Sequence, residues 1–153
     1  ELVRAAAGVH GFPGRTLGGC RVVTGTGRHR REFLICREAR GLPEPMPVEA
    51  CQRMLWDRRF QVRFKDFVSG AVHRPRLEAL GEQGWLEFIG QCPEKRTCEI
   101  PAPARPALPA LFDEKGLLSA PHLGFQRFDG PPEIANIRFF PPNSLSRAGF
   151  FLR

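Results

Sequence analysis

The sequence predicts an α+β domain in which a mainly antiparallel sheet, built from β-hairpins, carries one short helical insertion. Two observations support this class. The apolar runs are short and are separated by turn-rich stretches, which is typical of hairpins. The stretch Arg59 to Phe67 alternates apolar and polar residues with a period of two, whereas Arg74 to Gln91 spaces its apolar residues as a helix does.

The first expected element is a β-hairpin over Arg15 to Arg40. The apolar runs LGGCRVV and EFLICRE flank the basic, turn-rich stretch TGTGRHRR. With the centre of the loop near Arg28, Cys20 is expected opposite Cys36. The loop tip is either a mobile phosphate contact or an ordinary solvated turn.

A connector follows at Gly41 to Pro47, where GLPEPMP carries three prolines. Proline lacks the backbone donor that a helix needs, so this stretch is not helical. It is the best candidate boundary in the chain. We therefore expect residues 1–42 to form a β-hairpin segment that ends a preceding region, and residues 43–153 to form a C-terminal α+β domain.

The clearest periodic signal predicts a strand over Arg59 to Phe67. Its apolar residues are expected on a buried face and its basic residues on a solvent-facing one. The alternating residues are Phe60, Val62 and Phe64 on one side, and Arg59, Gln61, Arg63 and Lys65 on the other. The basic side is either an ordinary solvated face or a strip of phosphate contacts.

Arg74 to Gln91 is expected to form two short helices joined at Gly81 to Gly84, because glycine weakens a helix interior. Trp85 lies on the apolar side, where a core position is favoured over base stacking. The proline-rich stretch Pro101 to Pro109 predicts an extended connection.

A second hairpin is expected over Leu108 to Phe125, with its turn at Asp113 to Gly116. Gly116 supplies the positive φ that such turns need. Ile134 to Phe140 predicts a further strand, which Pro141 and Pro142 end.

Composition excludes several classes of protein. With 42% apolar and 25% charged residues the chain is close to the globular average, which argues against wholesale disorder. No apolar run approaches the roughly 20 residues that span a bilayer, so no membrane partner is expected. The net charge of +7 favours polyanionic partners. Arginine supplies most of this charge, and it suits bidentate phosphate contacts but also accumulates in proteins from GC-rich genomes.

The five cysteines form no Cys-x-x-Cys pair, which favours a reduced, cytoplasmic protein without a metal site. His122 is the most plausible single catalytic candidate, because it sits in Pro-His-Leu-Gly and titrates near neutrality. No recognisable nucleophile accompanies it, and no phosphate-binding loop or dinucleotide fingerprint occurs. We therefore expect a structural histidine and no catalytic residue in this chain.

Several ordered blocks carry a family resemblance. They are RTLGGCRVV, FLICREAR, MLWDRRFQV and IPAPARPALPALFDEKGLLSAPHLGF, followed by a tail with Phe139, Phe140, Phe150 and Phe151. Together they resemble the C-terminal region of bacterial tRNA(Ile)-lysidine synthetases of the alphaproteobacterial type. The Ser-Gly-Gly-x-Asp-Ser loop of that family's N-terminal ATP-pyrophosphatase domain has no counterpart here. The chain starts at Glu1 and its first methionine is Met46, so we expect a piece of a longer enzyme.

The resemblance implies that the parent enzyme is an ATP-dependent tRNA-modifying ligase, which joins lysine to the wobble cytidine of isoleucine tRNA. It implies that this chain is the tRNA-docking portion and holds no cofactor, since ATP and magnesium belong to the missing catalytic domain. The expected partners are tRNA and that missing N-terminal domain, and a homodimer is left open. Charge pattern alone selects the candidate contacts: Arg28, Arg30, Arg31, Arg58, Arg59, Arg63, Lys65, Arg74 and Arg76.

Two other classes remain open. The chain is alternatively a structural or protein-interaction domain with no RNA binding of its own, whose basic surface is an effect of composition. The second alternative is a small hydrolase or transferase that uses His122 with a nearby carboxylate or cysteine. That enzyme would need a concave pocket around His122 with a strongly perturbed titrating group.

Overall fold

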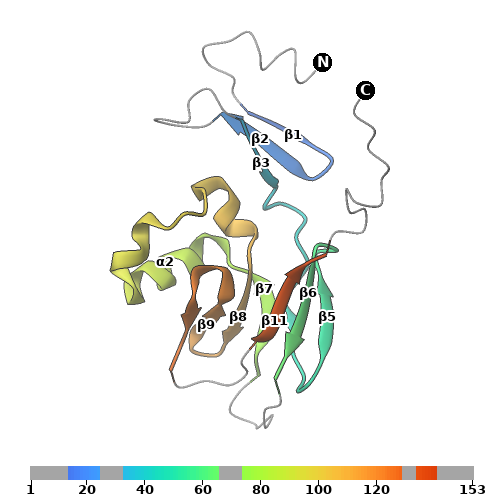
Figure 1. Ribbon diagram of the computed structural model, residues 1–153, viewed down its shortest axis with the longest axis vertical. Coiled ribbons are helices and arrows are strands. Elements are labelled where there is room, and N and C mark those ends of the chain that lie inside the picture. The colour runs from blue at the N-terminus through green and yellow to red at the C-terminus, as the bar shows by residue number, and fades with distance from the viewer. Residues whose placement is uncertain (1–13, 25–32, 66–73, 129–133, 141–153) are drawn as a thin grey trace.

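The computed structural model describes residues 14–24, 33–65, 74–128 and 134–140. These residues form three antiparallel sheets, one α-helix and short 3-10 helices (Figure 1). The predicted α+β class, mainly antiparallel with a short helical insertion, is confirmed. In strand order, the sheets are β1-β2-β3, β10-β9-β8-β7-β4 and β11-β6-β5.

The bounds of the elements follow the chain. The strands are β1 (Arg15–Leu17), β2 (Cys20–Thr24), β3 (Phe33–Arg37), β4 (Met46–Pro47), β5 (Arg53–Trp56), β6 (Phe60–Phe64), β7 (Arg76–Ala79), β8 (Pro109–Asp113), β9 (Gly116–Ala120), β10 (Phe125–Gln126) and β11 (Ile134–Phe139). The helix is α2 (Gly81–Gln91), and the 3-10 helices are η2 (Pro93–Thr97), η3 (Ala102–Ala107) and η4 (Pro121–Leu123).

The body of the protein has three layers, with the five-stranded sheet in the middle (Figure 1). One core lies between this sheet and β11-β6-β5, and contains Trp56, Val62 and Leu111. A second core lies between the same sheet and α2, and contains Phe88 and Leu117. Because both faces of β8 and β9 are covered, these strands are nearly continuous apolar runs rather than alternating ones.

The predicted strand at residues 59–67 is confirmed for its central part. Phe60, Val62 and Phe64 of β6 are at most 7% exposed, whereas Gln61 and Arg63 face solvent. β6 pairs with β5 through a tight turn in which Asp57 and Arg58 both adopt positive φ, at 48° and 55°. The inner face of this sheet therefore belongs to the core, and the outer face remains available to partners.

The first hairpin differs from the prediction in two ways. Gly18 and Gly19, both with positive φ, form a turn that divides the expected first strand into β1 and β2. The register of β2 and β3 is shifted by one residue, because Cys20 lies opposite Arg37 instead of Cys36. Such a shift reverses which residues share a face. Cys20 is exposed and Cys36 is buried, on opposite faces of the sheet.

The helix predicted over residues 74–91 is wrong in its first half. Arg76–Ala79 form β7, which pairs with β4 and β8, so a place in the central sheet overrides a helix-forming composition. A single helix, α2, starts at Gly81. A Cβ on Gly84 would lie 2.7 Å from the Phe112 ring and 3.0 Å from Leu80, so this glycine permits close packing of the helix on the sheet.

The remaining elements follow the prediction with one exception. The hairpin β8–β9 turns before Gly116, whose φ is 106°, and β11 occupies Ile134–Phe139. The proline-rich connection was expected to be extended, but Ala102–Ala107 form the 3-10 helix η3. A proline at the first turn suits this short helix. No helix within the described residues is long and apolar enough to cross a membrane.

Candidate nucleic-acid interface

The outer face of the sheet β11-β6-β5 gathers arginines from three strands. Arg63 on β6 lies directly between Arg53 on β5 and Asn136 on β11. Two residues away along β6, on the same face, Gln61 lies between Leu55 and Arg138. We call this surface the basic face, and define it as Arg53, Leu55, Gln61, Arg63, Asn136 and Arg138.

The sequence places these side chains outward because the alternate positions are required inside. Met54 and Trp56 of β5, and Val62 of β6, are buried in the core between the two sheets. In a strand, successive side chains point to opposite faces. The residues between these core positions therefore face solvent, whatever their own chemistry.

The basic face has no internal countercharge. None of its six residues is acidic, and within the described part of the chain neither Arg53 nor Arg63 pairs with a carboxylate. Like charges directly opposite each other in a sheet are mildly destabilising. Arg53 and Arg63 occupy such a pair. An arrangement of this kind gains stability when a bound anion lies between the two guanidinium groups.

Arg59 was expected on this face, but the structure directs its side chain elsewhere. Its Nε donates to Asp57 Oδ2 at 2.6 Å, and its Nη2 donates to the carbonyl oxygen of Ala107 at 3.0 Å. The guanidinium also lies over the Phe60 ring at 5.1 Å. Regular alternation starts only at Phe60, because the left-handed residues of the preceding turn reorient the chain. Arg59 therefore stabilises the fold through these intramolecular contacts.

Asp57 also connects the N-terminal sheet with the body. Arg37 of β3 donates to both of its carboxylate oxygens, at 3.1 and 3.2 Å. The same guanidinium donates to the carbonyl oxygens of Gly19 and Gly41, each at 2.9 Å. These contacts cross the predicted boundary between residues 42 and 43, so the hairpin segment is fastened to the domain that follows it.

The other predicted contacts are dispersed. Arg58 is exposed in the β5–β6 turn, Lys65 is exposed just after β6, and Arg74 is exposed before β7. Arg76 lies in the central sheet, half-buried, with its Nη2 3.7 Å from Glu78 Oε1. Arg28, Arg30 and Arg31 lie outside the described residues.

Sequence reasoning missed Arg53 and Arg138, although both contribute to the basic face. A signal for each was present. Arg53 begins the alternating stretch Arg-Met-Leu-Trp, and Arg138 follows Ile137 in the predicted last strand. Their approach to Arg63 depends on which strands are neighbours, which a short alternating pattern does not specify.

His122 has the surroundings of a packed surface histidine. Its ring contacts Phe60 edge-on, with the centroids 5.2 Å apart. Partial burial, and to a lesser degree the charge of Arg59, lower the pKa of His122 below its ordinary value. The described residues contain no group of three histidine, cysteine or acidic side chains placed to hold a metal ion.

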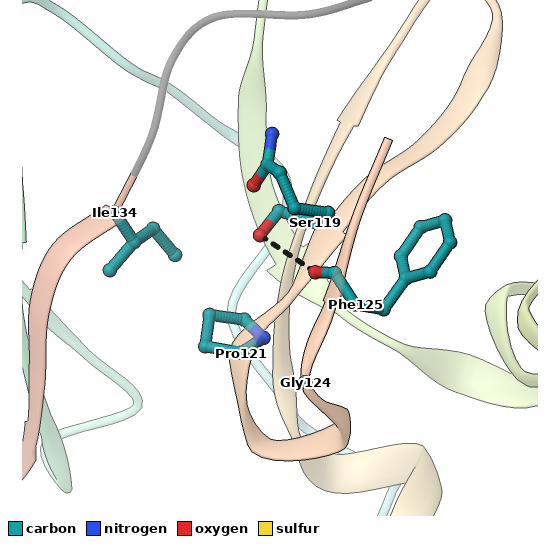
Figure 2. Close-up of a pocket in the computed structure, with 6 residues that line it drawn as sticks. Ser119, Pro121, Gly124, Phe125 and Ile134 are labelled. Atoms are coloured by element: carbon teal, nitrogen blue, oxygen red, sulfur yellow. Dashed lines mark hydrogen bonds between the residues drawn. The ribbon is translucent and has the colours of Figure 1, made fainter. Parts of the chain in front are cut away.

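A pocket of about 380 Å³ lies near His122 but does not include it (Figure 2). Its lining includes Ser119, Pro121 and Phe125 from the β9–β10 region, and Ile134 at the start of β11. The Ser119 hydroxyl donates to the carbonyl oxygen of Phe125 at 3.3 Å. The serine in this pocket therefore binds the backbone, and among the described residues it has no hydrogen bond to His122, which gives no support to a hydrolase centred on His122.

Comparison with protein-family models finds no match to this chain, and comparisons with curated proteins and with solved structures find none either. The fold and the site themselves define a class. It is an antiparallel α+β domain with an arginine-rich sheet face and a separate three-stranded sheet at its N-terminal end that exposes several apolar side chains.

Proposed function

We propose that this chain is the tRNA-docking portion of a cytoplasmic tRNA(Ile)-lysidine synthetase, and that the basic face binds the phosphate backbone. The observation that carries the RNA-binding role is a set of three arginines on one sheet face that pair with no carboxylate among the residues the structure describes. The ordered sequence blocks support the family. In this role the chain performs no chemistry, and ATP and magnesium act in the catalytic domain of the parent enzyme.

The chemistry of the basic face suits phosphates better than base edges. Each guanidinium presents a planar set of donors that matches two oxygens of one phosphate. Neighbouring strands hold Arg53 and Arg63 about 5 Å apart, and successive rows on one face lie about 7 Å apart. Backbone contacts on such a flat surface position a duplex without reading its sequence.

The test is binding of the chain to isoleucine tRNA and to an unrelated RNA duplex at moderate salt. The variant Arg53→Gln/Arg63→Gln/Arg138→Gln removes the charges of the basic face and retains polar side chains. The control Arg21→Gln/Arg40→Gln/Arg96→Gln removes the same charge from exposed positions elsewhere. We expect the first variant to lose most of its tRNA affinity and the control to lose little.

Equal losses in the two variants would show that only net charge matters and would reject the basic face as the site. Absence of binding to either RNA would reject the RNA-binding role of this chain. Binding that does not prefer isoleucine tRNA would keep the basic face but remove support for the lysidine synthetase assignment.

A protein-interaction role is supported by a different observation, at the N-terminal sheet. One face of β1-β2-β3 exposes Leu17, Phe33 and Ile35, with exposed fractions of 65%, 44% and 68%. We call these three residues the apolar face. Exposed apolar groups on one sheet face are typical of a surface that another protein covers. In a lysidine synthetase the natural occupant is the catalytic domain that precedes this portion.

This second role is tested with Leu17→Lys/Ile35→Lys. We expect the variant to fold as the wild type does, because these two side chains are 65% and 68% exposed. We expect it to lose binding to a separately produced catalytic domain of a lysidine synthetase, measured by calorimetry. Unchanged binding would exclude the apolar face as the contact surface.

A further inference from the structure

A pocket of about 290 Å³ lies where helix α2 packs against the 3-10 helix η3, and it shares no residue with the basic face. Its volume is at the lower end of the range typical of small-molecule sites. Each helix contributes three residues at spacings of three and four, which lie on one side of a helix. They are Glu82, Trp85 and Leu86 of α2, and Ala102, Arg105 and Pro106 of η3.

The guanidinium of Arg105 is held in place, and its outer nitrogens stay free. It lies over the Trp85 ring, 4.2 Å from the ring centroid, and its Nε donates to the carbonyl oxygen of Ile100 at 2.8 Å. Among the described residues, no group accepts a hydrogen bond from its two Nη atoms. Two N–H donors of one guanidinium match the two oxygens of a carboxylate. Because Arg105 is already ordered, binding an anion costs it little conformational freedom.

Glu82 gives the same pocket a negative charge. Its exposed carboxylate pairs with no cation within the described part of the chain, and it forms no ion pair with Arg105. A carboxylate at this position repels phosphate groups, so the pocket is a poor site for nucleic acid. The two separate, opposite charges favour a small ligand that carries both an anionic and a cationic group.

The remaining walls of the pocket are apolar. Leu86 is 57% exposed, Ala102 is also exposed, and Pro106 is half-buried. An aliphatic group placed against these side chains removes apolar surface from water on both partners. The walls therefore select an apolar body for the ligand, next to its two charges.

We propose that this pocket binds a free α-amino acid with an aliphatic side chain. Arg105 binds the carboxylate, Glu82 binds the ammonium group, and Leu86 contacts the side chain. A residue within a peptide does not present both charges on one carbon atom, so the ligand is the free amino acid. The site is independent of the basic face and of the RNA-binding role.

The test uses the whole chain and three probes of similar shape: leucine, leucinamide, which lacks the carboxylate, and 4-methylpentanoate, which lacks the ammonium group. NMR follows the indole N–H signals of the two tryptophans, which Trp85→Phe assigns. Trp85 lines the pocket, whereas Trp56 is fully buried in the other core. We expect leucine to shift only the Trp85 signal, with saturation below about 10 mM. Each analogue should bind about tenfold more weakly than leucine.

Glu82→Gln is the informative variant, because Glu82 is exposed and has no side-chain partner among the described residues. It should weaken leucine binding about tenfold and leave binding of 4-methylpentanoate unchanged. Glu94→Gln is the matched control, since Glu94 is an exposed glutamate of η2 outside the pocket, and it should bind leucine as the wild type does. Ala102→Phe adds a ring at an exposed wall position and should abolish leucine binding.

Three results would overturn the proposal. The first is a wild-type Trp85 signal that does not move with leucine at about 10 mM. The second is equal binding of leucine and 4-methylpentanoate, which would show that the ammonium group is not recognised. The third is unchanged leucine binding in Glu82→Gln or in Ala102→Phe, which would place the ligand elsewhere on the protein.

Discussion

The two three-stranded sheets of this protein have the same architecture but differ in the chemistry of their outer surfaces. Both β1-β2-β3 and β11-β6-β5 are antiparallel. On one face the first sheet exposes Leu17, Phe33 and Ile35 together with a single arginine, Arg15, whereas the outer face of the second exposes three arginines, among them Arg53 and Arg63. Burial explains the inner face of the second sheet, but it explains neither outer face. The outer faces therefore carry the two proposals about partners: another protein for the first sheet and a polyanion for the second.

The two sheets also differ in how their inner faces are covered. The inner face of β11-β6-β5 contributes Trp56, Val62 and Phe64 to a continuous core, all at most 1% exposed. The N-terminal sheet contributes less to the hydrophobic core. Among its strand residues only Cys36 is buried, and the Cys36 thiol lies 3.6 Å from the carbonyl oxygen of Pro103. Burial raises the pKa of this thiol, so it remains protonated and serves as a packing group. The sheet is held mainly by the polar contacts of Arg37.

The largest expected effect comes from removing the carboxylate that joins the two sheets. Asp57 is 8% exposed in its side chain and pairs with Arg37 and Arg59. Asp57→Ala leaves two partly buried guanidinium groups without their countercharge. We expect the free energy of unfolding to fall by about 3 kcal/mol, measured by urea denaturation.

Asp57→Asn is the control for backbone strain at this position. Asparagine tolerates the positive φ of 48° that residue 57 adopts, whereas alanine does not. If the loss came from the turn alone, Asp57→Asn would be as stable as the wild type. We expect Asp57→Asn to lose most of the stability that Asp57→Ala loses, because the charge is absent in both.

A matched pair of truncations compares the sheets directly. Val62→Ala removes two methyl groups from a side chain that is fully buried, and should cost about 2 kcal/mol. Ile35→Ala shortens a side chain that is 68% exposed, and should change stability by about 0.5 kcal/mol or less. A large loss in Ile35→Ala would mean that the apolar face is covered within the chain itself.

The smallest expected effect is a dependence of stability on pH through His122. Its folded pKa is lowered below 6.5 by burial and by Arg59, so the unfolded chain binds the proton more tightly. Stability should therefore be fully present above the unfolded pKa and decline as the pH falls through 6.5 toward the folded pKa. Urea denaturation at several pH values should show a shallower decline for His122→Phe. An identical decline would assign the effect to other groups.

Sequence reasoning found the elements whose pattern is local. The strand β6 was recognisable because one face is buried and the other is polar, and the β8–β9 turn because Gly116 needs positive φ. The strand β7 was missed because Arg, Leu, Glu and Ala favour a helix, and only pairing with β4 and β8 places them in a sheet. Local propensity does not contain that information.

The candidate site was predictable in part for the same reason. Arg63 was placed correctly on the outer face by alternation within one strand. Arg53 comes from the preceding strand β5 and lies opposite Arg63, whereas Arg138 comes from β11, far along the chain, and lies opposite Gln61. Strand pairing alone brings these arginines onto one face. Arg59 was misplaced because Asp57 and Arg58 adopt left-handed conformations, which no alternating pattern reveals.

The most direct test of the central claim is the salt dependence of RNA binding by the wild type and by Arg53→Gln/Arg63→Gln/Arg138→Gln. Each arginine that contacts a phosphate of a duplex contributes about 0.9 to the slope of log affinity against log salt concentration. We predict that the slope of the triple variant is shallower than that of the wild type by about 2 to 3. An unchanged slope, with binding retained, would contradict the assignment of the basic face as the phosphate-binding surface.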